Sequence, residues 1–446
     1  MIWTYEEAID YLYSFIDYER RPQVRYAPSV MNLERPHRLL EALGNPHEGY
    51  PVLHIAGTKG KGSVGAYCQA ALQAAGLRAG LYSSPHLQWF QERFRINEEM
   101  IDRETFTALL AEIKPVADQI PGLTWFELTT ALAFLYFARQ EVDAAVCEVG
   151  LGGRLDATNL VTPVVSVITS LSYDHTHLLG NTLAQIATEK AGIIKPGIPV
   201  VSAPQEPEAE AVLRRIAGER AAPLTMVGAD WQYQAGDTTR RGQHFRAGRA
   251  GEPLRDYWTP LTGRHQALNG TVALATLDLA RKAGLDLTAK AMADGLARVN
   301  WPGRFEIIEE QPWIVLDAAH NGASARCLRE TLDAIFPEIP NRTLIFGASA
   351  DKDVKGMFGA LLPAVEHLIL AQAVHPRALS SEALAAQVAE LDFAGTVELC
   401  PVMTDALQRA RQWAGQDGLI VVTGSLFIVG EARDICGLTP GRATYC

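Results

Sequence analysis

A glycine-rich loop between an apolar run and a helical pattern constrains this chain more than any other segment. Residues 52–56 are apolar apart from one histidine, and they lead into residues 57–63 (Gly-Thr-Lys-Gly-Lys-Gly-Ser). Small and apolar residues at helical spacing continue to about Ala75, and Gly76 ends the pattern. A strand, a glycine loop and a helix in this order form the context of a phosphate-binding loop, because glycines let several backbone N–H groups surround one anion.

The polar residues of this loop extend the same interpretation. Lys61 is placed to reach the β- and γ-phosphates of a nucleotide, and the Ser63 hydroxyl is placed to reach Mg²⁺. The N-terminus of the following helix adds free N–H donors and a partial positive charge. The spacing differs from the common G-x4-G-K-[ST] motif. The alternative is an ordinary glycine-rich turn with solvent-exposed lysines, and the lysine and serine inside the loop favour the phosphate site.

Length and charge limit the classes of protein to consider. A chain of 446 residues is too long for one ordinary core, so we expect two or three domains. The net charge of −11 provides no overall attraction for nucleic acid or for an anionic membrane, and we expect neither as a partner. An anionic substrate therefore needs locally placed Lys, Arg or Mg²⁺. No run of 18 apolar residues, no signal peptide and no Cys-x-x-Cys pair is visible, which predicts a cytoplasmic protein.

Strand and helix patterns alternate along most of the chain. This predicts an α/β fold with an N-terminal P-loop ATPase domain, built on a mostly parallel sheet, and a smaller C-terminal Rossmann-like α/β domain. We place the boundary at the turn-rich residues 299–304, giving domains 1–298 and 299–446. The segment 204–260 is rich in Arg, Gly, Gln and Thr, which favours short antiparallel strands or a surface excursion. The main strands are expected at 77–82, 143–149, 164–169, 199–203, 312–317, 342–347, 366–371 and 418–423.

Acidic and histidine side chains follow several of these strands. Glu148 ends the strand at 143–149, and His175 follows the next one. Ligands in open α/β sheets bind at the carboxyl ends of strands, so Glu148 is well placed to hold Mg²⁺ beside a bound triphosphate. The alternatives are an acid that caps a turn and a histidine satisfied by ordinary hydrogen bonds. Asp317 and His320 end a strand in the second half, where a strand end before a helix-capping Asn is the alternative.

Ten motifs in fixed order resemble those of the Mur ligase superfamily, specifically the folylpolyglutamate synthase and bifunctional dihydrofolate synthase/folylpolyglutamate synthase family. The most specific is Gly-Leu-Gly-Gly-Arg-Leu-Asp-Ala-Thr-Asn at 150–159. The resemblance covers nearly the whole chain. One departure is Lys59, where the family loop usually has Asn. The motifs lie at 57–63, 82–87, 148–159, 174–175, 189–195, 265–269, 301–306, 317–321, 351–353 and 424–433.

The resemblance implies a role for individual positions. Residues implied to bind ATP are Gly60, Lys61, Gly62, Ser63, Asn269, Arg304 and Asp317. Residues implied to hold two Mg²⁺ ions are Ser63, Ser84 and Glu148 for the first, and His175 with Lys190 for the second. The family carbamylates this lysine, although residue type alone favours a pair between Lys190 and Glu189 or a phosphate. Residues implied to contact the pterin-bearing substrate are Ser83, Pro85, Asp156 and Ala157. Residues implied to act in catalysis are Lys61, Lys190, Asp317 and His320.

The implied activity is ATP-dependent amide formation by a monomeric enzyme. A carboxylate of a folate or pteroate would be phosphorylated, and L-glutamate would displace the phosphate. Another ligase of the superfamily, acting on a UDP-sugar peptide, would need a nucleotide-sugar domain for which the stretch before the loop is too short. An ATPase switch without ligase activity is the alternative from another class. A Rossmann dehydrogenase is disfavoured, because the loop lacks G-x-G-x-x-G spacing.

Overall fold

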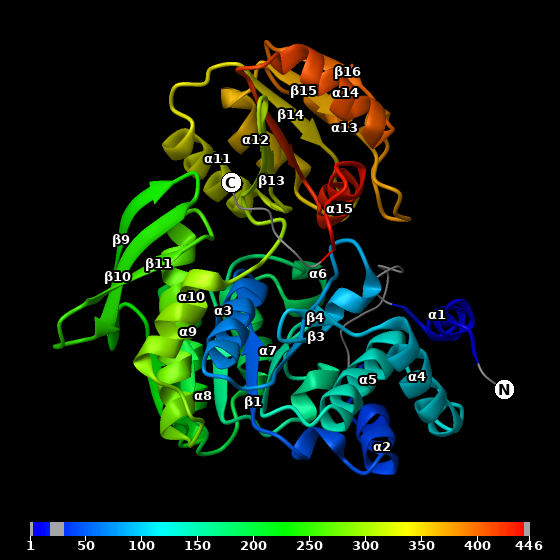
Figure 1. Ribbon diagram of the computed structural model, residues 1–446, viewed down its shortest axis with the longest axis vertical. Coiled ribbons are helices and arrows are strands. Elements are labelled where there is room, and N and C mark those ends of the chain that lie inside the picture. The colour runs from blue at the N-terminus through cyan, green and yellow to red at the C-terminus, as the bar shows by residue number, and fades with distance from the viewer. Residues whose placement is uncertain (1–2, 18–30, 441–446) are drawn as a thin grey trace.

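Two α/β bodies make up most of the computed structural model, which describes residues 3–17 and 31–440 (Figure 1). The larger body contains an eight-stranded sheet in the order β4-β3-β2-β5-β1-β6-β7-β8. The neighbours among β2, β5, β1, β6, β7 and β8 all pair in parallel. The pairs β2–β3 and β3–β4 are antiparallel. The strands are β1 (Val52–Ala56), β2 (Ala79–Tyr82), β3 (Phe94–Ile96), β4 (Glu99–Met100), β5 (Ala144–Glu148), β6 (Val165–Ile168), β7 (Val200–Ser202) and β8 (Leu224–Met226).

Helices cover both faces of this sheet, so its central strands are buried on both sides and are almost continuously apolar. Alternate strand residues face opposite layers: Val52 packs on one side and Leu53 on the other. The first face is covered by α1 (Tyr5–Tyr13), α2 (Glu34–Ala42), α4 (Arg103–Ala117), α5 (Trp125–Arg139), α7 (Leu183–Lys190) and α8 (Pro207–Glu219). The second is covered by α3 (Lys61–Ala74), α9 (Arg264–Lys282) and α10 (Ala289–Arg298).

The segment 204–260 divides into two parts. Its second part forms the expected antiparallel sheet, with β9 (Trp231–Thr239), β10 (Gly242–Arg249) and β11 (Arg255–Thr259), which projects beside α9 (Figure 1). Its first part was not expected to be helical, yet it contains α8, and β8 joins the main sheet. Pro at the first helical position and an apolar stripe from Ala209 to Leu213 explain why this part is a helix.

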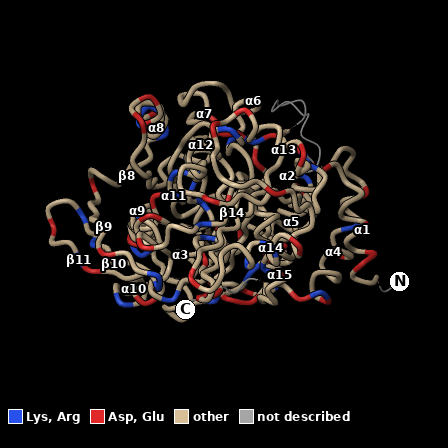
Figure 2. The backbone as a smooth tube through the Cα atoms, turned by 90° about the horizontal axis from the view of Figure 1, so that it is seen from above, with Lys and Arg blue, Asp and Glu red and all other residues tan. Residues whose placement is uncertain are grey.

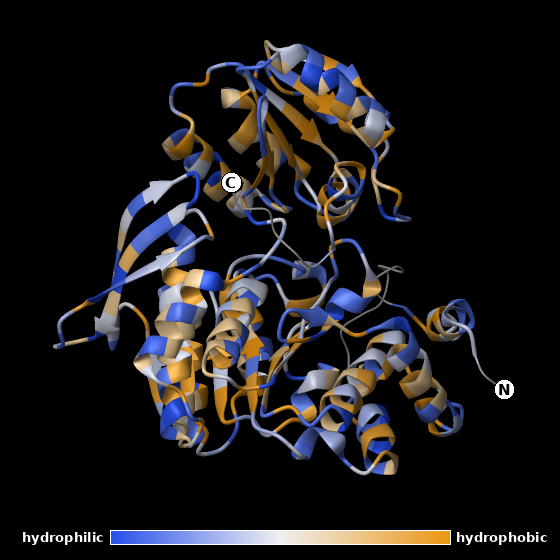
Figure 3. Cartoon of the chain, in the orientation of Figure 1, coloured by the Kyte–Doolittle hydropathy of each residue, from blue (hydrophilic) through white to orange (hydrophobic). Residues whose placement is uncertain are grey.

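The smaller body has a six-stranded sheet in the order β12-β13-β17-β14-β15-β16, with only β12 antiparallel to its neighbour. Its strands are β12 (Glu306–Glu310), β13 (Trp313–Leu316), β14 (Arg342–Phe346), β15 (His367–Leu370), β16 (Thr396–Leu399) and β17 (Leu419–Thr423). Its helices are α11 (Gly322–Ile335), α12 (Val354–Leu361), α13 (Ser381–Val388), α14 (Met403–Ala414) and α15 (Leu426–Ile435). Apolar strands lie inside and polar helix faces lie outside (Figure 3). The expected fold class is confirmed.

Short elements fill the connections. The short helices are α6 (Thr176–Leu179) and the 3₁₀ segments η1 (Pro46–Glu48), η2 (Phe90–Arg93), η3 (Ala157–Leu160), η4 (Ala191–Ile193) and η5 (Leu362–Ala364). The apolar spacing of residues 5–19 predicts a single helix, but α1 ends at Tyr13, and residues 18–19 lie outside the described residues. Acidic and basic residues are interleaved around the molecule (Figure 2). Within residues 3–17 and 31–440, no helix has the length and apolar character needed to cross a bilayer.

Candidate active site

The carboxyl ends of parallel strands from both bodies face one cavity of about 650 Å³. In the larger sheet, the neighbouring strands β2, β5, β1 and β6 end there, and in the smaller sheet β13, β17, β14 and β15 do. This is the edge at which open α/β sheets bind ligands. The predicted site residues that line the cavity are Gly60, Lys61, Gly62, Ser63, Ser84, Pro85, Glu148, Asp156, Ala157, His175, Lys190, Asn269, Arg304, Asp317 and His320. Ser83 does not line it; this residue is buried, and its backbone N–H donates to Arg93.

The glycine loop is closely packed where it turns into α3. Gly60 has φ of +85°, and a Cβ there would lie 2.4 Å from Oδ1 of Asn269 on α9. Both the left-handed backbone and the close approach therefore require glycine at this position. The backbone N–H groups of Thr58 and Lys59 donate to the carbonyl of Ser170, which anchors the start of the loop to the segment after β6. The loop thus directs the N-terminus of α3 toward the cavity.

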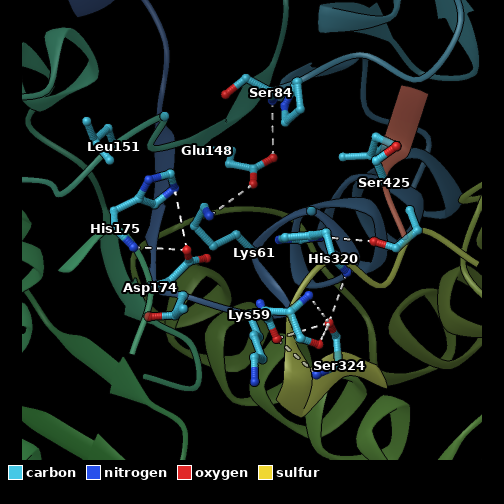
Figure 4. A pocket seen from close by; sticks show the side chains of 18 of the residues that line it. Lys59, Lys61, Ser84, Glu148, Leu151, Asp174, His175, His320, Ser324 and Ser425 are labelled. Atoms are coloured by element: carbon cyan, nitrogen blue, oxygen red, sulfur yellow. Dashed lines mark hydrogen bonds and ion pairs between the residues drawn. The ribbon is translucent and has the colours of Figure 1, made fainter. Parts of the chain in front are cut away.

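Lys61 and Glu148 form the charged centre of the cavity (Figure 4). The Lys61 Nζ lies 3.6 Å from Oε1 of Glu148, and the Ser84 backbone N–H donates to Oε2 at 3.4 Å. Burial raises the pKa of Glu148, and the nearby Lys61 ammonium opposes that rise. Together with the hydroxyls of Ser63 and Ser84, the carboxylate provides the oxygen donors that Mg²⁺ prefers. In the described residues, no group of three or more His, Cys, Asp or Glu is arranged to hold a metal.

His175 occupies an unusual backbone conformation at the start of α6, with φ of +48°. Its Nε2 lies 3.9 Å from Oδ1 of Asp174. Burial alone would raise the pKa of Asp174, but the nearby His175 and Lys352 lower it to about 2. Lys352 comes from the smaller body, and its Nζ lies 3.5 Å from Oδ1 of Asp174. An ion pair therefore crosses the cavity between the two bodies.

Lys190 is almost fully buried at the end of α7. Its Nζ donates to the carbonyl of Gly57 at 2.8 Å. Burial, followed by the nearby Lys61, lowers the pKa of Lys190 to about 7. The alternative partner suggested by the sequence is engaged elsewhere, since the Glu189 carboxylate accepts two hydrogen bonds from Arg154. Lys190 thus faces the phosphate loop as a buried amine that is easily deprotonated.

The smaller body contributes Asp317 and His320 after β13. Both oxygens of Asp317 accept backbone N–H groups, from Phe305 and from Ala319, each at 2.9 Å. His320 Nδ1 lies 3.0 Å from the carbonyl of Ala318. A carbonyl can only accept, so Nδ1 carries the hydrogen, and Nε2 of a neutral ring remains an acceptor.

Sequence reasoning missed several cavity residues, among them two pairs of neighbouring side chains. His375 and Arg377 follow β15, and Nη1 of Arg377 lies 3.6 Å from Oδ2 of Asp351. Trp125 and Phe126 begin α5 and line the cavity beside the loop after β5. The strand-end rule that identified Glu148 could also have identified the first pair. An aromatic dipeptide at a helix start carries no comparable signal.

Two family models match the chain. Residues 55–277 match the Mur ligase middle domain, and residues 303–426 match the Mur ligase glutamate ligase domain. The chain belongs to the Mur ligase family. Its relatives place it in the folylpolyglutamate synthase branch, as the motifs indicated, and it is an ATP-dependent ligase.

Three relatives illustrate the similarity. A probable bifunctional folylpolyglutamate synthase/dihydropteroate synthase of Haloferax volcanii is 38% identical over 440 residues, covering 96% of this chain. The chain spans only 50% of that protein's length. The dihydrofolate synthase/folylpolyglutamate synthase of Bacillus subtilis is 32% identical over 442 residues, with 97% and 99% of the two chains covered. A solved structure of Mycobacterium tuberculosis folylpolyglutamate synthase complexed with ADP has a TM-score of 0.88 at 34% identity, covering 97% of this chain and 100% of that chain.

Proposed function

We propose that this Mur ligase adds L-glutamate to tetrahydrofolate through an acyl phosphate, with dihydropteroate as a second candidate substrate. One observation carries the proposal: a phosphate loop with Lys61 beside Glu148 faces Asp317 and His320 across a single cavity. The names of the relatives support the choice of substrates, since they are folylpolyglutamate and dihydrofolate synthases. We also propose that the chain divides into domains 1–298 and 299–446 and that the protein is a monomer.

The chemistry would begin with attack of a folate carboxylate oxygen on the γ-phosphorus of ATP. ADP leaves, and the acyl phosphate keeps the transferred phosphoryl group. Lys61 and the N–H groups of Gly60 to Ser63 offset the charge that develops on the phosphoryl oxygens. The glutamate amine then attacks the activated carbonyl carbon, a proton is released from the nitrogen, and inorganic phosphate leaves. Closure of the two bodies over the cavity would exclude water that would otherwise hydrolyse the acyl phosphate.

The donor set at the cavity fits two Mg²⁺ ions. Ser63, Ser84 and Glu148 would hold one, and His175 with a carbamylated Lys190 would hold the other. When bound, the ions supply positive charge beside the phosphates. The lowered pKa of Lys190 supports carbamylation, because only the neutral amine adds CO₂. The carbamate would keep one N–H for the carbonyl of Gly57 and would replace a buried cation by an anion suited to Mg²⁺.

One assay tests the proposal directly. Incorporation of labelled L-glutamate would be measured with ATP and Mg²⁺, in parallel on tetrahydrofolate and on dihydropteroate. We expect glutamate-dependent ADP formation in step with amide product. ATP hydrolysis that is indifferent to glutamate and to both substrates would instead identify a nucleotide-gated ATPase.

We also propose a cytoplasmic location, consistent with the free thiols of the five cysteines that the structure describes.

A further inference from the structure

A buried polar chain runs beneath the glycine loop that follows β5. It begins at His54, in the middle of the central strand β1, where neighbouring positions are apolar and His54 itself is fully buried. The His54 Nε2 lies 2.8 Å from the hydroxyl of Thr158, which is also fully buried. A histidine at the centre of a parallel sheet is costly unless its ring is hydrogen-bonded, so this contact has to be explained.

The direction of each hydrogen bond follows from the groups involved. The Thr158 hydroxyl lies 2.5 Å from Oδ1 of Asp156. Burial raises the pKa of Asp156, but three backbone N–H groups donate to its oxygens and favour the ionised form, which can only accept. The Thr158 hydroxyl therefore donates its single hydrogen to Asp156, and its oxygen accepts a hydrogen bond from Nε2–H of His54. His54 is thereby fixed as the neutral tautomer with its hydrogen on Nε2. Burial, followed by Lys195, lowers the pKa of His54 to about 3, which keeps the ring neutral.

The Asp156 carboxylate is fully occupied within its own loop. Oδ1 accepts from the Thr158 hydroxyl and from its backbone N–H at 3.0 Å. Oδ2 accepts from the backbone N–H groups of Gly150 and Leu151 at 3.1 and 3.0 Å. Four donors fill about four lone-pair positions, so no acceptor position is left for a ligand. The carboxylate closes the loop 150–158 into one shape.

The closed loop forms one wall of the cavity. Leu151, Leu155 and Ala157 line it, next to the aromatic rings of Trp125 and Phe126. A Cβ on Gly150 would lie 2.4 Å from the Phe126 ring, so the loop and this ring are in close contact. An apolar wall with aromatic neighbours suits a flat, conjugated ring system, and its shape depends on the position of the loop.

We propose that His54 and Thr158 are positioning residues that act through Asp156, and that Asp156 shapes the substrate wall instead of binding the substrate with its carboxylate. His54, Thr158 and Asp156 together form a hydrogen-bonded relay. The identification of the substrate as a folate rests on the proposed function, whereas the relay itself does not. The relay extends from the core of the sheet to the cavity in three side chains. Breaking it at any point should loosen the loop without touching the residues proposed to bind ATP.

The test compares Thr158→Val, which removes the hydroxyl, with Thr158→Ser, which keeps it. His54→Gln is a second variant, because a glutamine Nε2 can still donate where His54 Nε2 does. Thr276→Val is the matched control: Thr276 is a buried threonine on α9 that bonds within its own helix and lies outside the cavity. Two quantities are measured, the KM values for tetrahydrofolate, ATP and glutamate, and backbone hydrogen exchange in peptides that contain residues 150–151.

For Thr158→Val we expect the KM for tetrahydrofolate to rise about tenfold or more, because a hydrogen bond to a buried carboxylate is lost. The KM values for ATP and glutamate should stay within about twofold. Exchange at 150–151 should accelerate about tenfold, while Thr158→Ser, His54→Gln and Thr276→Val remain close to wild type. Unchanged exchange at 150–151 in Thr158→Val would overturn the relay. If exchange at 150–151 is faster in Thr158→Val but the wild-type protein ligates glutamate to neither substrate, the relay is supported and the proposed function is refuted.

Discussion

Lys61 is the side chain on which phosphoryl transfer depends most. We expect Lys61→Ala to lower kcat by about 100-fold or more, because the proposed phosphate loop places this ammonium where it would offset charge on the transferred phosphoryl group. The fold should persist, since the side chain faces a cavity and belongs to none of the apolar cores. Steady-state kinetics at saturating ATP and circular dichroism provide the measurements. Lys355→Ala, at an exposed lysine of α12, is the control. Normal turnover of Lys61→Ala would refute the phosphate-loop assignment.

His54 should make the stability of the protein depend on pH. Its pKa is about 3 in the folded state against about 6.5 in an unfolded chain. Between these values the unfolded state binds a proton that the folded state does not, so acidification favours unfolding. The contribution is about 1.4 kcal/mol per pH unit. Between pH 6 and pH 4, wild type should therefore lose about 3 kcal/mol more of its free energy of unfolding than His54→Gln. Parallel curves for the two proteins in urea titrations would contradict this.

The positions of several site residues could be predicted because a strand end is visible in a sequence. An apolar run that stops at an acid predicted that Glu148 and Asp317 end strands at the ligand-binding edge, and both residues line the cavity. The state of Asp156 could not be predicted, because its four donors come together only when the loop closes. The same holds for Lys190, whose bond to Gly57 joins residues far apart in the chain. Spacing predicts where a side chain lies, but not how many of its hydrogen bonds are already made.

Helices and strands were predictable where their periodicity was strong. The central strands lie where the pattern placed them, because they are buried on both faces. The amphipathic spacing of residues 322–335 likewise predicts a helix, and α11 lies there. The edge strands β12 and β16 were missed, since they are short and partly exposed. Helix α8 was missed despite its proline start, because the polar segment after it dominated the interpretation of 204–260.

The loop between β2 and β3 connects the two bodies. Leu87 from this loop packs into the apolar core of the smaller body. The next residue, Gln88, accepts a hydrogen bond from Arg433 on α15 at 2.8 Å and donates to Asp434 and to the carbonyl of Leu438, at 2.7 and 3.2 Å. Arg433 is fully buried and also pairs with Glu306. Red α15 lies next to the blue-cyan chain of the larger body in Figure 1.

This loop should couple the metal-facing residues to the smaller body. Ser84 lies four residues before Gln88 and donates to Glu148. Gln88→Ala removes the acceptor of the buried Arg433 Nε, so we expect the loop to shift. The Mg²⁺ concentration that gives half the maximal rate should rise severalfold, and kcat should fall. Magnesium titrations of the rate are the measurement. Gln119→Ala, at an exposed glutamine after α4, should behave as wild type. Equal magnesium titrations for Gln88→Ala and wild type would refute the coupling.

Nucleotide binding should stabilise both bodies at once, because the proposed contacts come from each. Lys61 and Asn269 lie on one side of the cavity, and Asp317 lies on the other. A non-hydrolysable ATP analogue at 100 times its Kd should raise the free energy of unfolding by about 2.7 kcal/mol. Hydrogen exchange should slow both at the phosphate loop and after β13. Protection confined to the larger body would show that the smaller one takes no part in binding, and Asp317→Asn should reduce protection of that body selectively.

Gly153 and Gly192 do not line the cavity, yet they have a consequence for tolerance to natural variation. A Cβ on Gly153 would lie 2.9 Å from the Glu189 carbonyl oxygen, and one on Gly192 would lie 2.4 Å from Cα of Arg154. The backbone of the loop 150–158 thus contacts the backbone at the end of α7. No change of side-chain rotamer can relieve the clash that an added methyl group would cause there. In a saturation-mutagenesis survey of growth, Gly153→Ala and Gly192→Ala should be depleted as strongly as Lys61→Ala. Gly218→Ala, whose Cβ would meet open space, should remain common. Alleles at these two positions would therefore resemble active-site lesions in a genetic screen, although neither residue takes part in the chemistry.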